Sequence, residues 1–158
     1  MFKFGKKSRE RMKGVHPELC EIMDISIKRS PIDFGITQGV RSLETQKKYV
    51  KLGKSKTLKS MHLPQEDGYS WAFDIHGFID GDICWERPIY DQLFTTIFAT
   101  AKELGYKLRW GGAWHLDNCI DHYPDLSCHD MTEEYVSLRK SQKRSWFLDL
   151  VHVERSRV

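Results

Sequence analysis

The sequence predicts an α+β protein in which helices surround a small, largely antiparallel sheet. Two stretches, residues 17–28 and 88–104, repeat apolar residues at helical spacing. Residues 71–79 instead alternate and carry bulky apolar side chains, which indicates a strand. The chain has 158 residues, enough for one hydrophobic core, and it contains no internal repeat and no linker rich in Pro, Gly or Ser. We therefore expect a single domain over residues 1–158.

The first half of the chain has clear element boundaries. Pro17 suits the first position of a helix, which is predicted to end before the Ser30-Pro31 break. Residues 33–37 then indicate a short strand. Ser42 is a suitable N-cap for a second helix, which is predicted to end near Gly53.

The second half predicts a hairpin, a long helix and several shorter elements. Residues 83–85 are expected to pair back onto the strand over residues 71–79 across a turn at Gly81-Asp82. Pro88 opens the long helix and Gly105 caps its end. The remaining predicted elements are, in order, a strand over 108–110, an irregular polar loop over 115–130, a short helix over 132–143 and a final strand over 147–154.

The composition excludes several classes of protein. Hydrophobic residues make up 40% and charged residues 30%, which is typical of a globular rather than a disordered chain. No segment approaches the roughly 18 consecutive apolar residues that a membrane span requires. The basic N-terminus lacks the apolar segment of a secretory signal, so we expect synthesis in the cytoplasm without a signal peptide. The four cysteines form no CxxC pair and are expected to be reduced thiols.

The net charge is only +3, but basic residues cluster in residues 3–13 and 139–144. Such clusters favour polyanions, which include nucleic acid, anionic lipid and an acidic cell wall. A solvated tail and a solvated helix face are the simpler interpretation, so a nucleic-acid binder is only a weak alternative.

Two stretches carry residues suited to metal chemistry. Ser60-Met61-His62 precedes Ala72-Phe73-Asp74, and Asp149-Leu150-Val151-His152 lies near the end of the chain. A catalytic zinc ion uses three protein ligands and leaves a fourth position for water, whose proton a nearby carboxylate can accept. Residues three apart on a regular strand face opposite sides, so Asp149 must precede the strand or lie at a bulge to act beside His152. With seven histidines in the chain, such a triple is also expected by chance.

The same stretches resemble the LAS (VanY-like) zinc peptidases, which include D-alanyl-D-alanine carboxypeptidases and dipeptidases and phage L-alanyl-D-glutamate endopeptidases. The family pattern is S-x-H, then G-x-A-x-D, then E/D-x-x-H, and this chain matches it in order. The single-domain phage endolysins are especially similar, and the shared segments span nearly the whole chain: Phe2-Lys3-Phe4-Gly5-Lys6, His16-Pro17-Glu18-Leu19, Gln38-Gly39-Val40-Arg41-Ser42 and Lys107-Leu108-Arg109-Trp110-Gly111. The implied fold is that of the Hedgehog and D-Ala-D-Ala peptidases.

The chain departs from the family pattern at two places. Residues 63–70 occupy a stretch that is normally about three residues long, and Ser70 stands where the family has glycine. A loop can lengthen at small entropic cost without moving its ends. Residues 114–143 are also expanded, which would alter the access of substrate.

The resemblance implies a role for each matching residue. His62, Asp74 and His152 would bind one catalytic zinc ion. Asp149 would take a proton from water and hand it to the leaving amine. Arg41 would bind the scissile carbonyl oxygen or a substrate carboxylate, and its alternative role is a structural ion pair.

The roles of two further residues, Ser60 and His76, stay open. Ser60 would hydrogen-bond substrate or only shape its loop. His76 lies two residues after Asp74 and could serve as a competing ligand or as a partner of one. A structural histidine is the simpler interpretation of His76.

The loop over residues 115–130 contains a second candidate metal site. Its cysteines and histidines suit a structural zinc ion, although their spacing fits no standard finger. Its aspartates could instead bind a regulatory calcium ion, and a plain acidic loop is the simplest alternative. The candidates are Cys119, His122, Cys128 and His129 for zinc, and Asp117, Asp121, Asp125 and Asp130 for calcium.

The resemblance implies a phage-type endolysin that cleaves between L-alanine and the γ-linked D-glutamate in the peptide stem of peptidoglycan. A D-alanyl-D-alanine carboxypeptidase or dipeptidase is the alternative with the same chemistry, and a non-catalytic zinc-binding module of the same fold is the alternative from another class. We expect a monomer that acts on the cell wall after membrane permeabilisation. We expect neither a nucleic-acid partner nor a stable association with the membrane.

Overall fold

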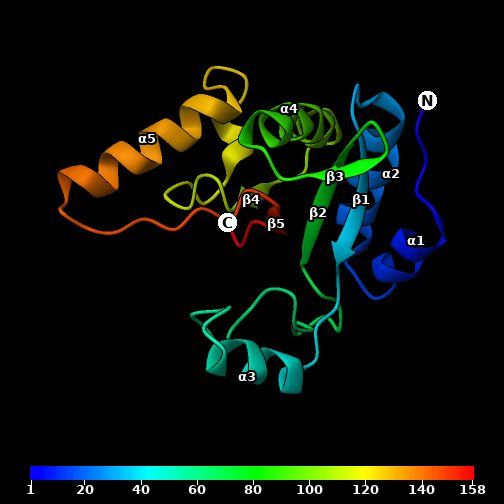
Figure 1. Cartoon of the computed structure of the whole chain (residues 1–158), viewed down its shortest axis with the longest axis horizontal. Helices are drawn as coiled ribbons and strands as arrows, with labels where there is room; N and C mark the ends of the chain where they lie inside the picture. The colour runs from blue at the N-terminus through cyan, green and yellow to red at the C-terminus, as the bar shows by residue number, and fades with distance from the viewer.

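The computed structural model describes residues 1–158 and contains one five-stranded antiparallel sheet (Figure 1). Four strands follow the order β1-β2-β5-β4, and β3 pairs with the end of β2 on the edge opposite β1. The strands are β1 (Asp33–Gln38), β2 (Ala72–Ile79), β3 (Asp82–Cys84), β4 (Leu108–Trp110) and β5 (His152–Arg155). The predicted α+β class, with a small antiparallel sheet, is confirmed.

Five α-helices flank the sheet. They are α1 (Lys6–Met12), α2 (Pro17–Arg29), α3 (Leu43–Lys51), α4 (Arg87–Leu104) and α5 (Cys128–Ser141), and a short 3-10 helix, η1, spans Cys119–Asp121. Helices α2 and α4 pack against each other and against the sheet, whereas α3 stands apart at the end of the sheet where β1 finishes and β2 begins (Figure 1). No helix has both the length and the apolar character needed to cross a membrane.

The hydrophobic core lies between the sheet and α2 and α4. Phe73 and Val153 are fully buried and pair in register across β2 and β5. The Trp110 ring of β4 packs on Phe94 and Phe98 of α4, with ring centroids 4.9 and 5.8 Å apart. Because side chains alternate along a strand, the neighbours of these core residues in sequence face the other side of the sheet.

Several predicted boundaries are confirmed by their capping contacts. The Ser42 hydroxyl accepts a hydrogen bond from the Thr45 amide at 3.1 Å and begins α3. Gly105 ends α4 in the left-handed conformation, with φ of 76°. The strand over residues 108–110 is found with the predicted bounds.

Other predicted boundaries were wrong for identifiable reasons. The final strand begins only at His152, because the His152 amide donates to the Asp149 carbonyl at 3.0 Å and closes a turn. Helix α5 begins at Cys128 rather than residue 132, because the Ser127 hydroxyl accepts from the Asp130 amide and caps it. The predicted loop over residues 115–130 therefore contains η1 and the first turn of α5.

Helix α1 was not predicted, since the basic residues of 3–13 suggested a solvated tail. The helix is held on the body of the protein by buried Ser8, whose hydroxyl accepts from the Ile36 amide at 3.0 Å. Phe4 packs edge-on against Phe34 of β1, with ring centroids 5.3 Å apart. These contacts place the basic side chains of α1 on an ordered surface.

Candidate metal centre

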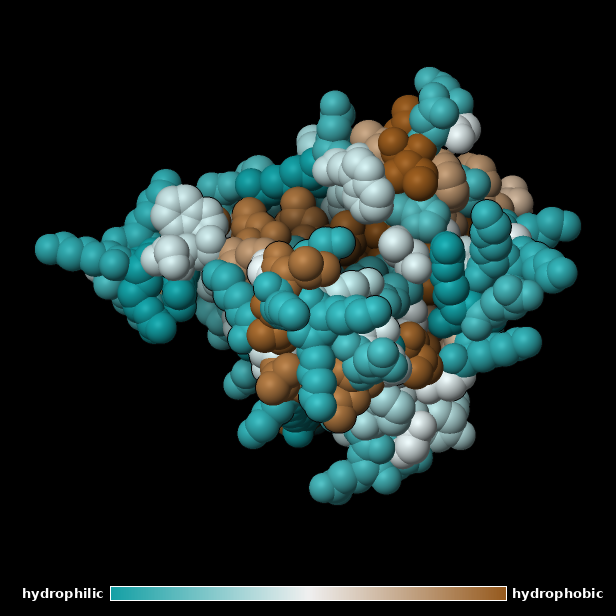
Figure 2. All heavy atoms as spheres, turned by 60° about the horizontal axis from the view of Figure 1, so that its bottom comes forward, coloured by the Kyte–Doolittle hydropathy of each residue, from teal (hydrophilic) through white to brown (hydrophobic).

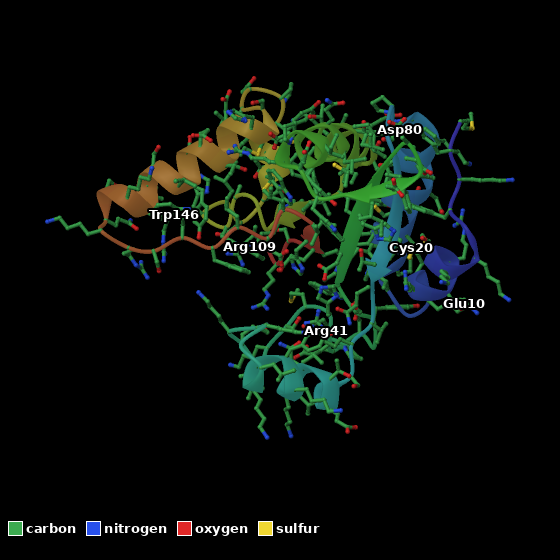
Figure 3. All side chains as sticks on the ribbon, viewed as in Figure 1. Glu10, Cys20, Arg41, Asp80, Arg109 and Trp146 are labelled. Carbon is green, nitrogen blue, oxygen red and sulfur yellow. The ribbon has the colours of Figure 1, made fainter.

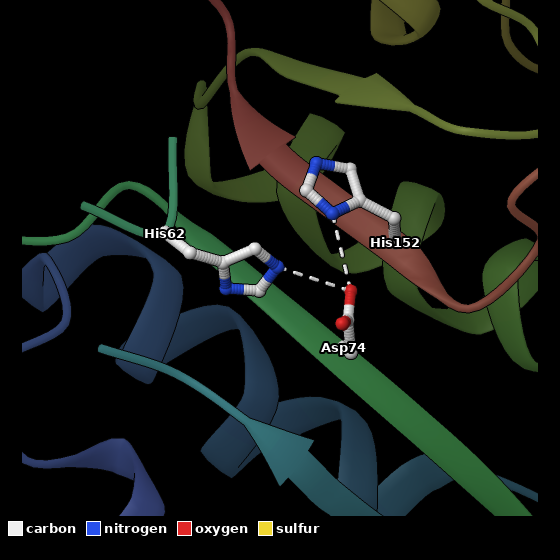
Figure 4. A group of neighbouring side chains, drawn as sticks. All are labelled: His62, Asp74 and His152. Carbon is white, nitrogen blue, oxygen red and sulfur yellow. Dashed lines mark hydrogen bonds and ion pairs between the residues drawn. The ribbon is translucent and has the colours of Figure 1, made fainter. Parts of the chain in front are cut away.

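Strand pairing brings the three predicted metal ligands together. Asp74 of β2 lies opposite His152 of β5, and His62 comes from the segment that leads into β2. Asp74 Oδ1 is 3.2 Å from His62 Nε2 and 3.1 Å from His152 Nδ1 (Figure 4). The three potential ligand atoms all lie within 4.8 Å of one another. Two imidazole nitrogens and one carboxylate oxygen are a donor set that suits zinc.

Each imidazole is oriented by an acceptor on its far side. His62 Nδ1 donates to the Gly39 carbonyl at 2.8 Å, and His152 Nε2 lies 2.9 Å from Glu154 Oε1. A carbonyl or carboxylate in this position holds the proton on one ring nitrogen and leaves the other nitrogen free to ligate a metal. His62 therefore presents Nε2 to the centre, whereas His152 presents Nδ1.

Hydrogen bonding also shifts the ionisation of these groups. Burial alone would raise the pKa of the Asp74 carboxyl, but the hydrogen bonds from His152 and His62 outweigh it and hold that pKa well below its usual range. Burial likewise lowers the pKa of His152, yet its bonds to Asp74 and Glu154 raise that pKa to about 10. A metal ion at the centre would therefore displace a proton from Nδ1 of His152, because only the neutral imidazole ligates a metal. Asp74 is thus anionic throughout the neutral range, as a metal ligand must be.

Asp149 lies in the turn before β5 and lines the same cleft as the three ligands. Its amide donates to the Gly111 carbonyl at 2.9 Å, which fixes the turn against the end of β4. The close approach requires glycine, since a Cβ at Gly111 would lie 2.1 Å from the Asp149 carbonyl oxygen. Burial raises the pKa of the Asp149 carboxyl, and the negative charge of Asp74 adds to the rise. The position of Asp149 before the strand agrees with the sequence prediction.

Arg41 is buried beside Asp74, with Nη2 3.9 Å from Asp74 Oδ2. Its guanidinium donates to the side-chain oxygens of Gln38 and Gln46 and lies 4.6 Å from the centre of the Tyr49 ring. Burial lowers the pKa of Arg41, and the Asp74 charge opposes this shift. Arg41 therefore has the structural ion pair that the sequence left open, and it also lines the cleft.

The Ser60 hydroxyl accepts a hydrogen bond from the His62 amide at 3.2 Å, so it shapes the segment that carries His62. The connection over residues 63–70, which is longer than in the family, is closed at its base, where the Trp71 amide donates to the Met61 carbonyl at 2.8 Å. Within it, the Gln65 amide donates to the Tyr69 carbonyl at 2.9 Å. Ser70, the residue at the family's glycine position, is fully buried, and its amide donates to the Gly14 carbonyl.

The candidate second metal site is not assembled. Cys119 and Cys128 are buried in the hydrophobic core, whereas His122 and His129 are exposed. The group at His62 is the only set of three or more potential ligands brought within reach of one ion, so the aspartates of residues 115–130 do not converge either. His76 is buried, and its Nδ1 lies 2.7 Å from the Thr37 hydroxyl, away from the centre.

The cleft around the metal centre has a volume of about 680 Å³. Several residues that line or support it were given no role by the sequence analysis, among them Gln46, Arg109, Trp114 and Glu154. Glu154 could have been found, because it lies two residues after His152 and therefore on the same face of the strand. Arg109 lies in a segment that the chain shares with the phage endolysins, whereas Gln46 and Trp114 carry no local signal, since distant segments bring them to the cleft.

Comparison with known proteins places this chain in a family. The model of the phage L-alanyl-D-glutamate peptidase family matches residues 1–132. The L-alanyl-D-glutamate peptidase of Escherichia phage T5 is 32% identical over 118 residues, which cover 72% of this chain and 82% of that protein. The L-Ala D-Glu endopeptidase ChiX of Serratia marcescens shares the fold, with a TM-score of 0.68 and 24% identity over 97% of this chain and 90% of that one. The chain belongs to the phage L-alanyl-D-glutamate peptidase family.

Proposed function

We propose that this protein is a zinc-dependent endopeptidase that cleaves the bond between L-alanine and D-glutamate in the peptide stem of peptidoglycan. Membership of the family supports the substrate class and the bond. The observation that carries the chemistry is a group of two imidazoles and a carboxylate with a second, free carboxylate in the same cleft. We further propose that the protein acts as a monomeric endolysin on the cell wall after membrane permeabilisation.

The donor set fits zinc, and His62, Asp74 and His152 would hold the ion. A bound zinc ion would polarise the scissile carbonyl and acidify a water molecule. Asp149 would accept a proton from the attacking water and deliver it to the leaving amine, a role that its raised pKa favours. The Arg41 guanidinium would stabilise negative charge on the carbonyl oxygen as it develops.

Two other functions differ from this one in measurable ways. A D-alanyl-D-alanine carboxypeptidase would use the same residues on another bond. A non-catalytic zinc module would need no proton acceptor, and the placement of Asp149 in the cleft favours an enzyme.

Digestion of purified peptidoglycan, followed by mass spectrometry, separates these functions. We expect new N-terminal D-glutamate, whereas free D-alanine would identify a carboxypeptidase.

Asp149→Asn should lower kcat by roughly 10²–10⁴-fold, because it removes the proton acceptor, and should retain its zinc. His152→Ala should lose zinc and activity together, and the exposed Asp125→Asn is a control with the same change of group. Digestion by Asp149→Asn at the wild-type rate would refute the proposed mechanism.

A further inference from the structure

The cleft beyond the metal centre is strongly cationic. Its only carboxylates are Asp74, Asp149 and Glu154, which belong to the metal centre and its supports. Five basic side chains line the cleft without an ion pair to any carboxylate: Lys54, Lys56, Lys59, Arg109 and Arg157. Five other arginines of the chain do form such pairs: Arg9, Arg29, Arg41, Arg87 and Arg155. A concave surface lined by unpaired positive charge attracts an anionic ligand.

The surface seen from the α3 side is largely hydrophilic (Figure 2). Figure 3 shows Arg41 on the α3 side and Arg109 on the sheet side, and both side chains line the cleft. The substrate would therefore lie between two guanidinium groups. Arg41 and Arg109 differ in their hydrogen bonds and ion pairs, and this difference indicates different roles in binding.

Arg41 already uses three of its five N–H donors within the protein. Its Nε and Nη2 donate to Gln38, its Nη1 donates to Gln46, and Asp74 balances its charge. Arg109 makes one hydrogen bond, from Nη2 to the Trp114 carbonyl at 2.8 Å, and it forms no ion pair with any carboxylate, including Glu154 on the neighbouring strand. Arg109 is thus the guanidinium with donors and charge left for a ligand.

Arg109 is also held next to the metal centre. It lies opposite Glu154 in the β4–β5 register, so its side chain shares the sheet face of Glu154 and His152. Its guanidinium lies 5.1 Å from the centre of the Trp114 ring, and that ring lies 5.5 Å from the His152 ring. Stacking on Trp114 restrains a planar fork that suits bidentate binding of a carboxylate.

The proposed substrate has a free carboxylate close to the bond that is cut. In a γ-linked glutamate the chain continues through the side-chain carboxyl, so the α-carboxylate remains free. That carboxylate is attached to the carbon that bears the scissile nitrogen. The bond that is cut therefore has a carboxylate group whose carbon lies two bonds from the scissile nitrogen.

The geometry points to Arg109 as the residue that binds the free α-carboxylate of the γ-linked glutamate, an inference that rests on the proposed function. The unpaired lysines and Arg157 of the same cleft attract the remainder of an acidic stem. This carboxylate subsite makes the enzyme selective for stems whose glutamate is not amidated.

Two synthetic stem peptides test the subsite, one with a free α-carboxylate and one with an α-carboxamide on the γ-linked glutamate. We expect the wild type to cleave the carboxylate peptide with a kcat/KM roughly 10-fold higher or more, because a charge-assisted bond is lost with the amide. Arg109→Gln should bring this ratio to within about 3-fold of unity, and Arg109→Lys should keep part of it because the charge remains. Lys107→Gln removes an exposed charge outside the cleft and should leave the ratio unchanged.

The ratio of the two rates on one protein preparation does not depend on how much of that preparation is folded. An unchanged ratio in Arg109→Gln would overturn the subsite, and so would equal rates for the two peptides in the wild type. A wild type that cleaves neither peptide before the glutamate would instead overturn the proposed function, and the subsite with it.

Discussion

The two histidines of the metal centre are equivalent in type but not in how they are held. The ring of His62 is oriented by a backbone carbonyl, that of Gly39, which no substitution removes. The ring of His152 is oriented by the Glu154 carboxylate, which is itself buried. Glu154 is therefore the one orienting group at this centre that mutagenesis can remove without changing a ligand.

Removing this carboxylate should weaken metal binding. We expect Glu154→Ala to lower zinc affinity by roughly 10- to 100-fold, because the His152 ring loses its fixed orientation and its basicity falls. Glu154→Gln should lose less, since its amide oxygen still accepts from Nε2. Competition with a chromogenic chelator measures the affinities, and Glu133→Gln, on an exposed acid of α5, is the control. Wild-type affinity in Glu154→Ala would contradict this account of His152.

The sequence predicted the residues of the candidate centre better than their surroundings. His62, Asp74 and His152 were identified because they match a family pattern, and Asp149 because the pattern includes an acid three residues before the last histidine. Gln46 was missed although it is fully buried, since its partners Arg41 and Thr57 come from two separate loops. Contacts of this kind depend on how loops return to a site, which residue spacing does not encode.

Among the elements, the turn of residues 149–152 determines the geometry of the site. It is anchored by a hydrogen bond from the Asp149 amide to the Gly111 carbonyl, directly after β4. Gly111 in turn donates to the His152 carbonyl at 2.9 Å. One backbone unit after β4 thus fixes both the proposed proton acceptor and a metal ligand.

Adding a methyl group at this contact should disturb the turn. We expect Gly111→Ala to destabilise the fold by about 1–3 kcal/mol, because the new Cβ would lie 2.1 Å from the Asp149 carbonyl oxygen. Activity should fall further than the loss of folded protein explains, since Asp149 moves. Urea denaturation and kcat on peptidoglycan measure the two effects. Gly5→Ala is the control, because nothing lies within 4 Å of its added Cβ, and equal behaviour of the two variants would refute the expectation.

Helices and strands whose own residues carry a clear sequence pattern were predicted well. Helices α2 and α4 have apolar residues at helical spacing and a proline at their start, and these features are local. The start of β5 was predicted five residues too early, because the turn that precedes it is anchored by a bond to Gly111, 38 residues away along the chain. Helix α1 was missed because its stability comes from buried contacts with β1 rather than from its own sequence.

At the scale of the whole molecule, one hydrophobic cluster includes residues from both ends of the chain. It contains Phe4 and Val153 as well as the thiols Cys119 and Cys128. We propose that residues 1–158 fold as a single domain around this cluster. Burial raises the pKa of the Cys119 and Cys128 thiols to about 12, so they are protonated and unreactive while the core is intact.

These two thiols should report global unfolding. At pH 8 we expect them to resist a thiol reagent in the native protein and to react at the urea concentration at which helical circular dichroism is lost, as measured by peptide mapping. Reaction at a clearly lower urea concentration would contradict a single cooperative domain.

Because an unfolded thiol ionises near pH 9.0, the stability that these protonated thiols contribute is complete below that pH. It is lost as the pH rises toward about 12.

The connection between His62 and Asp74 has a property that bears on protein engineering. Its base is tied by the bond between the Trp71 amide and the Met61 carbonyl, whereas Glu66, Asp67 and Gly68 at its tip are exposed. A foreign peptide grafted at this tip would be carried outside the cleft, which no residue of 63–70 lines, while the tie keeps the spacing of His62 and Asp74 on either side. The tip is accordingly an attachment point for a module that directs the protein to a chosen bacterial surface.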